Sequence, residues 1–78
     1  MKIEEASKYS IRNKDFIEKS DLCSCYYCFS TFKKEEIDNW ADSGQTAICP
    51  KCSVDSVLGD YTIKFDKEFF EKLHEYWF

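Results

Sequence analysis

The sequence has 78 residues, which is enough for one small domain and too few for a two-domain protein or a large enzyme. It carries 15 acidic and 11 basic side chains and a formal net charge of −4, so nucleic acid is an unfavoured partner. A hydrophobic core of this size is only marginally stable, and natural chains this short commonly add disulfides, a structural metal or a partner subunit.

The distribution of charge along the chain also indicates a compartment. The first residues are charged where a signal peptide needs an apolar core, and no segment approaches the roughly 20 apolar residues of a membrane span. We therefore expect a cytoplasmic protein that does not associate with membranes. Thiols stay reduced in the cytoplasm, so the five Cys predict metal ligands or redox centres before structural disulfides.

The N-terminal residues carry the weakest structural signal. Residues 1–12 are polar without a clear apolar period, and we predict a loosely held arm ahead of a single domain over residues 13–78. Residues 15–22 fit either a short helix or an extended segment that leads into the Cys cluster, and the pattern leaves both open.

Residues 34–42 have the apolar spacing of a helix. Ile37, Trp40 and Ala41 fall at i, i+3 and i+4 and would share one face. Gly44 follows shortly afterwards and could supply the left-handed conformation that ends many helices. The sequence therefore predicts a helix between the two Cys pairs.

Two short segments have the character of strands. Residues 46–48 lead into the second Cys pair, and residues 61–65 alternate apolar and polar side chains as a half-buried strand does. Between them, Asp55 and Ser56 could form a catalytic pair, but side chains of this type more often close turns through their own hydrogen bonds.

The C-terminal residues predict a well-defined helix that begins at Asp66 or Lys67 and ends at about Trp77. Asp66 is a good N-cap, and Phe65 and Phe70 occupy the positions of a hydrophobic staple. Apolar residues cover a broad arc of this helix, so it must pack on the domain or on a partner.

The strongest motif is a pair of C-x-x-C units, Cys25-Tyr26-Tyr27-Cys28 and Cys49-Pro50-Lys51-Cys52, separated by 20 residues. Each unit brings two sulfur atoms to one side of a tight loop, and two such knuckles complete a tetrahedral S₄ site. We predict Zn²⁺ held by Cys25, Cys28, Cys49 and Cys52 in a structural role. Iron is less expected, because rubredoxin-like knuckles usually have Gly where Phe29 and Ser53 stand here.

Cys23 is the fifth thiol, two residues before the first knuckle. It could be an additional ligand or a reactive thiol beside the metal, but a small buried hydrophobic residue is the favoured interpretation. His74, the only His, is interpreted as a partly exposed helical residue without a catalytic or metal-binding role.

The aromatic residues divide into predicted core and predicted surface. We expect Phe29, Phe32 and Trp40 to pack around the metal site, because a minimal core needs large apolar groups. The residues of the first knuckle and of the C-terminal end are instead candidates for a partner surface, because exposed aromatic residues are enriched where proteins bind one another. These candidates are Tyr26, Tyr27, Tyr76 and Trp77, with Phe78 beside them.

The arrangement of these motifs resembles a family of small bacterial proteins usually labelled only "cytoplasmic protein". The resemblance covers residues 13–78 and depends on the segments 23–28, 46–52 and 55–59, on Phe32, Glu36-Ile37 and Trp40, and on the ending 68–78. It implies a bacterial, soluble, zinc-ribbon-like protein without a known activity. The sequence differs from the family in having Ser24 and Ser53 where Gly is usual and in a shorter loop after Gly59.

Together these observations predict an α+β domain of zinc-ribbon or treble-clef-like form, with two knuckles, short strands, a helix between the knuckles and a C-terminal helix. We expect a non-catalytic, zinc-stabilised interaction module whose partner is another protein or a second copy of the chain. One alternative is a zinc ribbon that binds nucleic acid through Lys33, Lys34 and Lys51. Another is a thiol redox switch that uses Cys23 beside the metal site.

Overall fold

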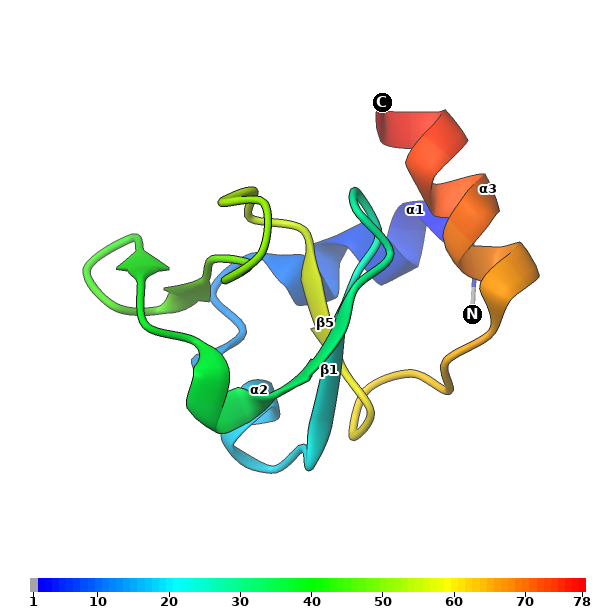
Figure 1. The fold of residues 1–78 in the computed structure, drawn as a ribbon. Coiled ribbons are helices and arrows are strands. Elements are labelled where there is room, and N and C mark those ends of the chain that lie inside the picture. The colour runs from blue at the N-terminus through cyan, green and yellow to red at the C-terminus, as the bar shows by residue number, and fades with distance from the viewer. Residues whose placement is uncertain (1) are drawn as a thin grey trace.

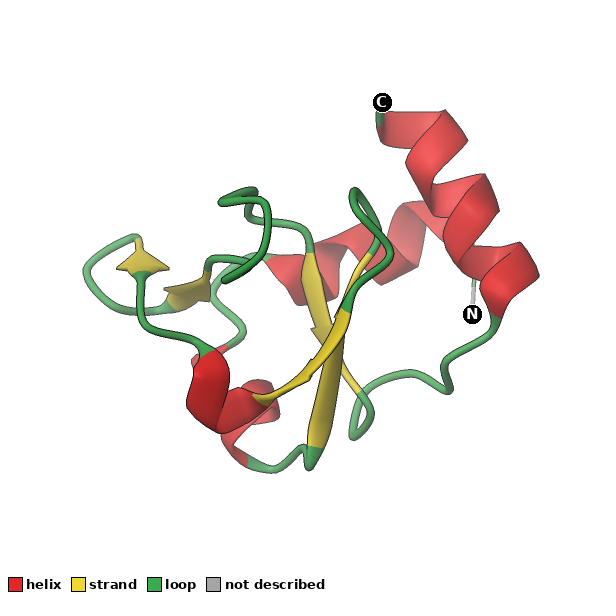
Figure 2. Ribbon diagram, viewed as in Figure 1, coloured by secondary structure: helices red, strands yellow, loops and turns green. Residues whose placement is uncertain are grey.

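The structure is a computed structural model, and it describes residues 2–78; Met1 lies outside the described residues. The fold belongs to the α+β class, with short helices around two small antiparallel sheets (Figures 1 and 2). In chain order the elements are α1 (Ile3–Ala6), the 3₁₀ helix η1 (Ser7–Ser10), α2 (Lys14–Glu18), β1 (Leu22–Cys25), β2 (Thr31–Lys33), the 3₁₀ helix η2 (Lys34–Glu36), β3 (Trp40–Ala41), β4 (Thr46–Ala47), β5 (Val57–Gly59) and α3 (Lys67–Trp77).

The central sheet has the strand order β2-β1-β5, and both pairings are antiparallel. Cys23 in β1 faces Phe32 on one side and Gly59 on the other. The second sheet is the β3–β4 hairpin, which lies at the opposite end of the molecule from α3 (Figure 1). The central sheet therefore separates the hairpin from the C-terminal helix.

Both faces of the central sheet are buried, and each belongs to a different apolar cluster. The first cluster consists of Ile17, Cys23, Cys25, Phe32, Ile37, Ala47, Cys49 and Val57. The second consists of Ala6, Tyr26, Leu58, Phe70 and Leu73. The neighbouring residues Val57 and Leu58 point to opposite faces of β5, as successive strand residues must, and so they belong to different clusters.

The N-terminal residues that the sequence assigns to an arm form α1 and η1. Ala6 is fully buried in the second cluster, and α1 packs against α3. Of the two alternatives for residues 15–22, the structure contains both in succession, because α2 ends at Glu18 and β1 begins at Leu22.

The predicted helix over residues 34–42 is wrong. Only Lys34–Glu36 are helical, as the single 3₁₀ turn η2, and Trp40 and Ala41 instead form β3. The Trp40–Ala47 and Ala41–Thr46 pairings form a hairpin, and Gly44 adopts its φ of 87° in the turn of that hairpin rather than at a helix end. Pairing between β3 and β4 therefore outweighs the helical preference that the local apolar spacing indicates.

The two predicted strands have different outcomes. The first is confirmed over Thr46–Ala47, which is β4. The second, over residues 61–65, is wrong, because these residues form turns and loop, and the third strand of the central sheet is Val57–Gly59 instead. A strand that is buried on both faces shows no alternation of apolar and polar residues, so β5 has no period-two pattern in the sequence.

Gly59 ends β5 at a close approach of two chain segments. A Cβ atom at this position would collide with the side chain of Ser20. The Ser20 hydroxyl donates to the Phe16 carbonyl at 2.8 Å and accepts from the Tyr61 N–H at 3.0 Å. Ser20 therefore joins the end of α2 to the segment after β5, and only Gly leaves room for it.

The predicted C-terminal helix is confirmed as α3. The Asp66 side chain accepts hydrogen bonds from the N–H groups of Glu68 at 2.9 Å and Phe69 at 3.4 Å, as an N-cap does. The Phe65 and Phe70 rings lie 5.7 Å apart, as the predicted staple requires. Over residues 2–78, α3 and the other helices are all too short or too polar to cross a lipid bilayer.

Candidate metal centre

The first C-x-x-C unit forms a tight loop between β1 and β2. The Phe29 N–H donates to the Cys25 carbonyl at 2.9 Å, and the Cys25 N–H donates to the Ser30 carbonyl at 3.0 Å. The Tyr27 N–H points at Cys25 Sγ across 3.3 Å. Backbone N–H groups directed at sulfur stabilise the thiolate form, which is the form that binds metals.

The second C-x-x-C unit, between β4 and β5, repeats this arrangement 24 residues later, as the residue numbers show. The Ser53 N–H donates to the Cys49 carbonyl at 2.9 Å, and the Cys49 N–H donates to the Val54 carbonyl at 2.9 Å. The Lys51 N–H points at Cys49 Sγ across 3.4 Å. The two loops therefore have equivalent hydrogen bonds, although their sequences share only the Cys residues.

The residue after each unit has a left-handed backbone. The φ angle of Phe29 is 64° and that of Ser53 is 66°. These are the two positions at which Gly is usual in rubredoxin-like knuckles, so the structure keeps the conformation while the sequence departs from the preferred residue. Ser24, the other Ser at a position where Gly is usual in the family, lies within β1 instead.

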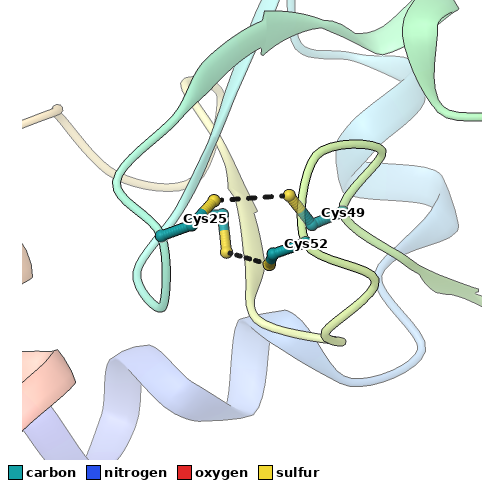
Figure 3. A group of neighbouring side chains, drawn as sticks. Cys25, Cys49 and Cys52 are labelled. Atoms are coloured by element: carbon teal, nitrogen blue, oxygen red, sulfur yellow. Dashed lines mark hydrogen bonds between the residues drawn. The ribbon is translucent and has the colours of Figure 1, made fainter.

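The two loops bring four sulfur atoms together (Figure 3). The Sγ atoms of Cys25, Cys28, Cys49 and Cys52 all lie within 4.8 Å of one another. The Cys25–Cys52 and Cys28–Cys49 separations are 3.6 and 3.7 Å. A Zn–S bond of about 2.3 Å implies S–S edges of about 3.8 Å in a tetrahedron, so the four thiols fit a single tetrahedral metal ion. All four are free Cys, since a disulfide needs a sulfur separation of about 2.05 Å.

Two hydroxyl groups contact this sulfur cluster. Ser56 is buried, and its Oγ lies 2.9 Å from Cys25 Sγ. Ser30 Oγ lies 3.3 Å from Cys28 Sγ. The sequence offers Ser56 as a catalytic partner of Asp55 or, in preference, as a turn residue, and it gives no signal for the role of Ser30. Both hydroxyls can donate a hydrogen bond to a thiolate, and such bonds orient the sulfur atom and stabilise its charged form.

The thiols of the cluster do not ionise equally. Burial raises the pKa of Cys25, and burial together with the neighbouring thiols raises that of Cys52. At Cys28 burial acts in the same direction but is outweighed by hydrogen bonds from Ser30 and the adjacent cysteines, and the pKa falls to about 7. Four thiolates at this spacing would repel one another, so a bound cation is the physical means of keeping all four deprotonated.

Cys23 is not a member of the four-sulfur group. It is fully buried in the first apolar cluster, between Phe32 and Gly59 across the sheet. Burial, with smaller contributions from the charges of Asp60 and Glu35, raises the pKa of its thiol to about 12. These features are those of a small core residue and not of a reactive thiol.

The predicted outward orientation of Tyr26 is wrong. Tyr26 is only 5 % exposed, and its hydroxyl shares a 3.1 Å hydrogen bond with Ser10 Oγ. It continues β1 in sequence and turns to the face of the sheet that α3 and η1 cover, so the packed N-terminal residues bury it. Tyr27, at the tip of the loop, is 41 % exposed as predicted.

The three residues predicted to pack in the core also have different outcomes. Phe32 is buried and Trp40 packs against the first cluster, but Phe29 is 45 % exposed, so its assignment to the core is wrong. The left-handed backbone at Phe29 directs its ring toward the C-terminal helix, where it lies 5.2 Å from the His74 ring.

The C-terminal end of α3 joins the first knuckle through aromatic contacts. His74 Nδ1 lies 3.2 Å from the Tyr26 carbonyl, and the Tyr27 and Phe78 rings meet edge to face at 4.7 Å. Tyr76 and Trp77 are about half exposed, as the prediction of a surface patch requires. His74 is therefore occupied in helix packing and lies outside the sulfur group.

The fold and the cluster define a small α+β domain with a four-cysteine site that is able to hold a metal ion. No family model, no curated protein and no solved structure matches the chain. The resemblance to the bacterial "cytoplasmic protein" family therefore stays a prediction from the motifs.

Proposed function

We propose that the protein is a non-catalytic interaction module whose fold is stabilised by one Zn²⁺ ion held by Cys25, Cys28, Cys49 and Cys52. The observation that carries this proposal is the convergence of four free sulfur atoms within 4.8 Å. Zinc is the metal of choice because it takes thiolates tetrahedrally and is redox-inert, whereas iron is the less favoured occupant of the same ligand set. The proposal includes a bacterial, cytoplasmic setting, where thiols stay reduced.

Within this proposal the protein is a zinc ribbon. Each knuckle is flanked by strands, with β1 and β2 around the first and β4 and β5 around the second. The helix expected between the knuckles is absent from residues 37–48, which form the β3–β4 hairpin and its flanking loops.

A structural role for the metal follows from the ligand number. Four protein thiolates complete the tetrahedral shell of zinc and leave no position for water or substrate. The metal then contributes folding free energy to a chain whose own core is small. For this reason we propose that the protein acts by binding a partner protein and not as an enzyme.

The nucleic-acid alternative finds less support in the basic side chains near the knuckles. Lys51 Nζ lies 3.5 Å from a carboxylate oxygen of Glu36, and Lys34 Nζ donates to the Glu18 carbonyl at 2.6 Å. Two of the three lysines are thus engaged within the protein itself, in a chain of net charge −4. Phosphate binding needs a cluster of free positive charge.

Native mass spectrometry of freshly purified protein, without reducing agent, tests the metal and the oligomeric state together. We expect one zinc ion per chain, lost in Cys52→Ser and retained in the matched variant Cys23→Ser. A metal-free chain with oxidised Cys pairs would contradict the proposal and favour thiol redox chemistry. A peak for two chains would identify the partner as a second copy.

A further inference from the structure

A small groove lies where η1, the first knuckle and the end of α3 meet. Its volume is about 240 Å³. Its lining includes Ser7, Ser10, Tyr26, Asp55, Trp77 and Phe78. None of these residues is a predicted metal ligand, so the groove is a separate feature of the molecule.

Three aromatic rings and the side chain of Ile11 give the groove its apolar walls. Tyr26 is fixed by burial and lies 6.1 Å from the Phe78 ring, centroid to centroid. Trp77 and Phe78 are 49 % and 56 % exposed. The walls therefore combine one fixed ring with two rings that solvent can reach, and aromatic faces of this kind attract cations.

The polar groups of the lining are satisfied with one exception. Ser10 Oγ donates to the Ser7 carbonyl at 2.7 Å and contacts the Tyr26 hydroxyl, and Ser7 Oγ donates to the Glu4 carbonyl at 3.0 Å. Asp55 is the one charged residue of the lining, and across residues 2–78 its carboxylate makes no ion pair or hydrogen bond. The groove thus presents an unpaired negative charge beside aromatic rings.

We propose that this groove binds an arginine side chain presented by a basic segment of the partner protein. The proposal rests on the proposed function as a protein-binding module, for which it specifies the chemistry of the partner. A guanidinium group is planar, stacks on aromatic rings and can bond a carboxylate through two N–H groups at once. A lysine ammonium group is more strongly hydrated and lacks the flat face that stacks on Trp or Tyr.

The test is a titration of the zinc-loaded full chain with the blocked tripeptide Gly-Arg-Gly, followed by the indole N–H resonance of Trp77. We expect a saturable shift with this peptide, a weaker one with Gly-Lys-Gly and none with Gly-Gln-Gly. Asp55→Asn should weaken binding about five-fold. The matched variant Asp38→Asn removes the same charge from an exposed loop residue outside the groove and should leave binding unchanged.

Three results would overturn the proposal: equal shifts with the arginine and glutamine peptides, equal affinity for the arginine and lysine peptides, or equal weakening by Asp55→Asn and Asp38→Asn. The last result would mean that only the net charge of the protein attracts the peptide. Failure of the metal proposal would be separate, because it would appear as missing zinc in the mass spectrum of the same sample.

Discussion

At Phe29 and Ser53 the residue type and the backbone conformation disagree. Both have left-handed φ angles, of 64° and 66°, which cost an ordinary L-residue about 1–2 kcal/mol relative to a right-handed conformation. The hydrogen bonds from their N–H groups to Cys25 and Cys49 hold them in this conformation. Each knuckle is therefore a strained loop that the sulfur site and the surrounding strands stabilise.

Ser53→Gly should relieve this strain at an exposed position. We expect the free energy of unfolding to rise by about 0.5–1 kcal/mol, because the gain at φ 66° exceeds the added chain entropy of Gly in the unfolded state. Urea denaturation at a fixed free zinc concentration would measure it. Ser53→Ala keeps the unfavourable conformation and should show no gain; equal stabilisation by both variants would contradict the explanation.

Cys23 provides a second prediction for a single residue. Its thiol is fully buried and its pKa is raised to about 12, so it should resist iodoacetamide at pH 8 in the folded protein and react once the chain is unfolded. Peptide mapping by mass spectrometry would show the modified positions. Rapid modification of Cys23 in the folded protein would instead favour the redox-switch alternative.

At the scale of the elements, the side chain of Asn13 connects the two sheets, which share no strand pairing. It is fully buried, donates through Nδ2 to the Val57 carbonyl of β5 at 2.8 Å, and accepts through Oδ1 from the Ala47 N–H of β4 at 3.1 Å. One side chain thus connects the central sheet to the β3–β4 hairpin. Sequence reasoning did not identify it, because a lone Asn before a short helix has the appearance of an ordinary N-cap.

Asn13→Ala should destabilise the protein by about 3 kcal/mol, because it leaves a buried N–H and a buried carbonyl without partners. Thermal unfolding followed by circular dichroism would measure the loss. Asn39→Ala, at an exposed position in the loop before β3, is the matched control and should change stability by less than about 0.5 kcal/mol. A similarly small effect of both variants would show that the hydrogen bonds of the Asn13 side chain contribute little to stability.

The helices and strands also show where a local sequence pattern is sufficient to predict secondary structure. Helix α3 has its cap, its staple and its apolar face within residues 65–77, and the sequence predicts it almost to the residue. The segment 34–42 has an equally plausible apolar spacing, but Trp40 and Ala41 pair with β4 instead. The N-cap and the staple of α3 lie within its own segment, whereas strand pairing at Trp40 and Ala41 is decided by residues elsewhere in the chain.

For the whole molecule, the two apolar clusters lie on opposite faces of one three-stranded sheet, and the sulfur site belongs to the first of them. Cys25 and Cys49 are core residues as well as members of the four-sulfur group. Losing the metal should therefore affect the packing of the whole sheet and not only the two loops.

The stability of the zinc-loaded protein should fall as the pH falls. A zinc ion held by the four thiols, as proposed, would keep them deprotonated, whereas the unfolded chain binds protons at those sulfurs. Unfolding would then take up protons, so acid would favour it. In the metal-free protein the pKa values of Cys25 and Cys52 are raised, and these thiols stay protonated at neutral pH in the folded and unfolded states alike. Their contribution to stability is then lost only at alkaline pH. Cys28 acts in the opposite direction, because its pKa falls to about 7 and its contribution to stability is lost as the pH falls toward that value.

Zinc release and circular dichroism, recorded together from pH 7.5 to pH 4, would test this linkage. We expect zinc release and loss of structure to coincide in the loaded protein, with no matching acid transition in protein treated with a chelator. Identical acid transitions with and without zinc would contradict a structural role of the metal.

The features that depend on neighbouring residues could be predicted from the sequence: the two C-x-x-C loops, the four sulfur atoms they present, and α3 with its cap. Three features became visible in the folded chain alone. These are the pairing of the strands, the burial of Tyr26 with the exposure of Phe29, and the hydrogen bonds by which Asn13, Ser30 and Ser56 support the core and the sulfur site. The difference lies in how far apart along the chain the interacting residues are. Turn geometry and helix capping are set within a few residues, whereas burial and strand pairing depend on contacts between residues far apart in the chain.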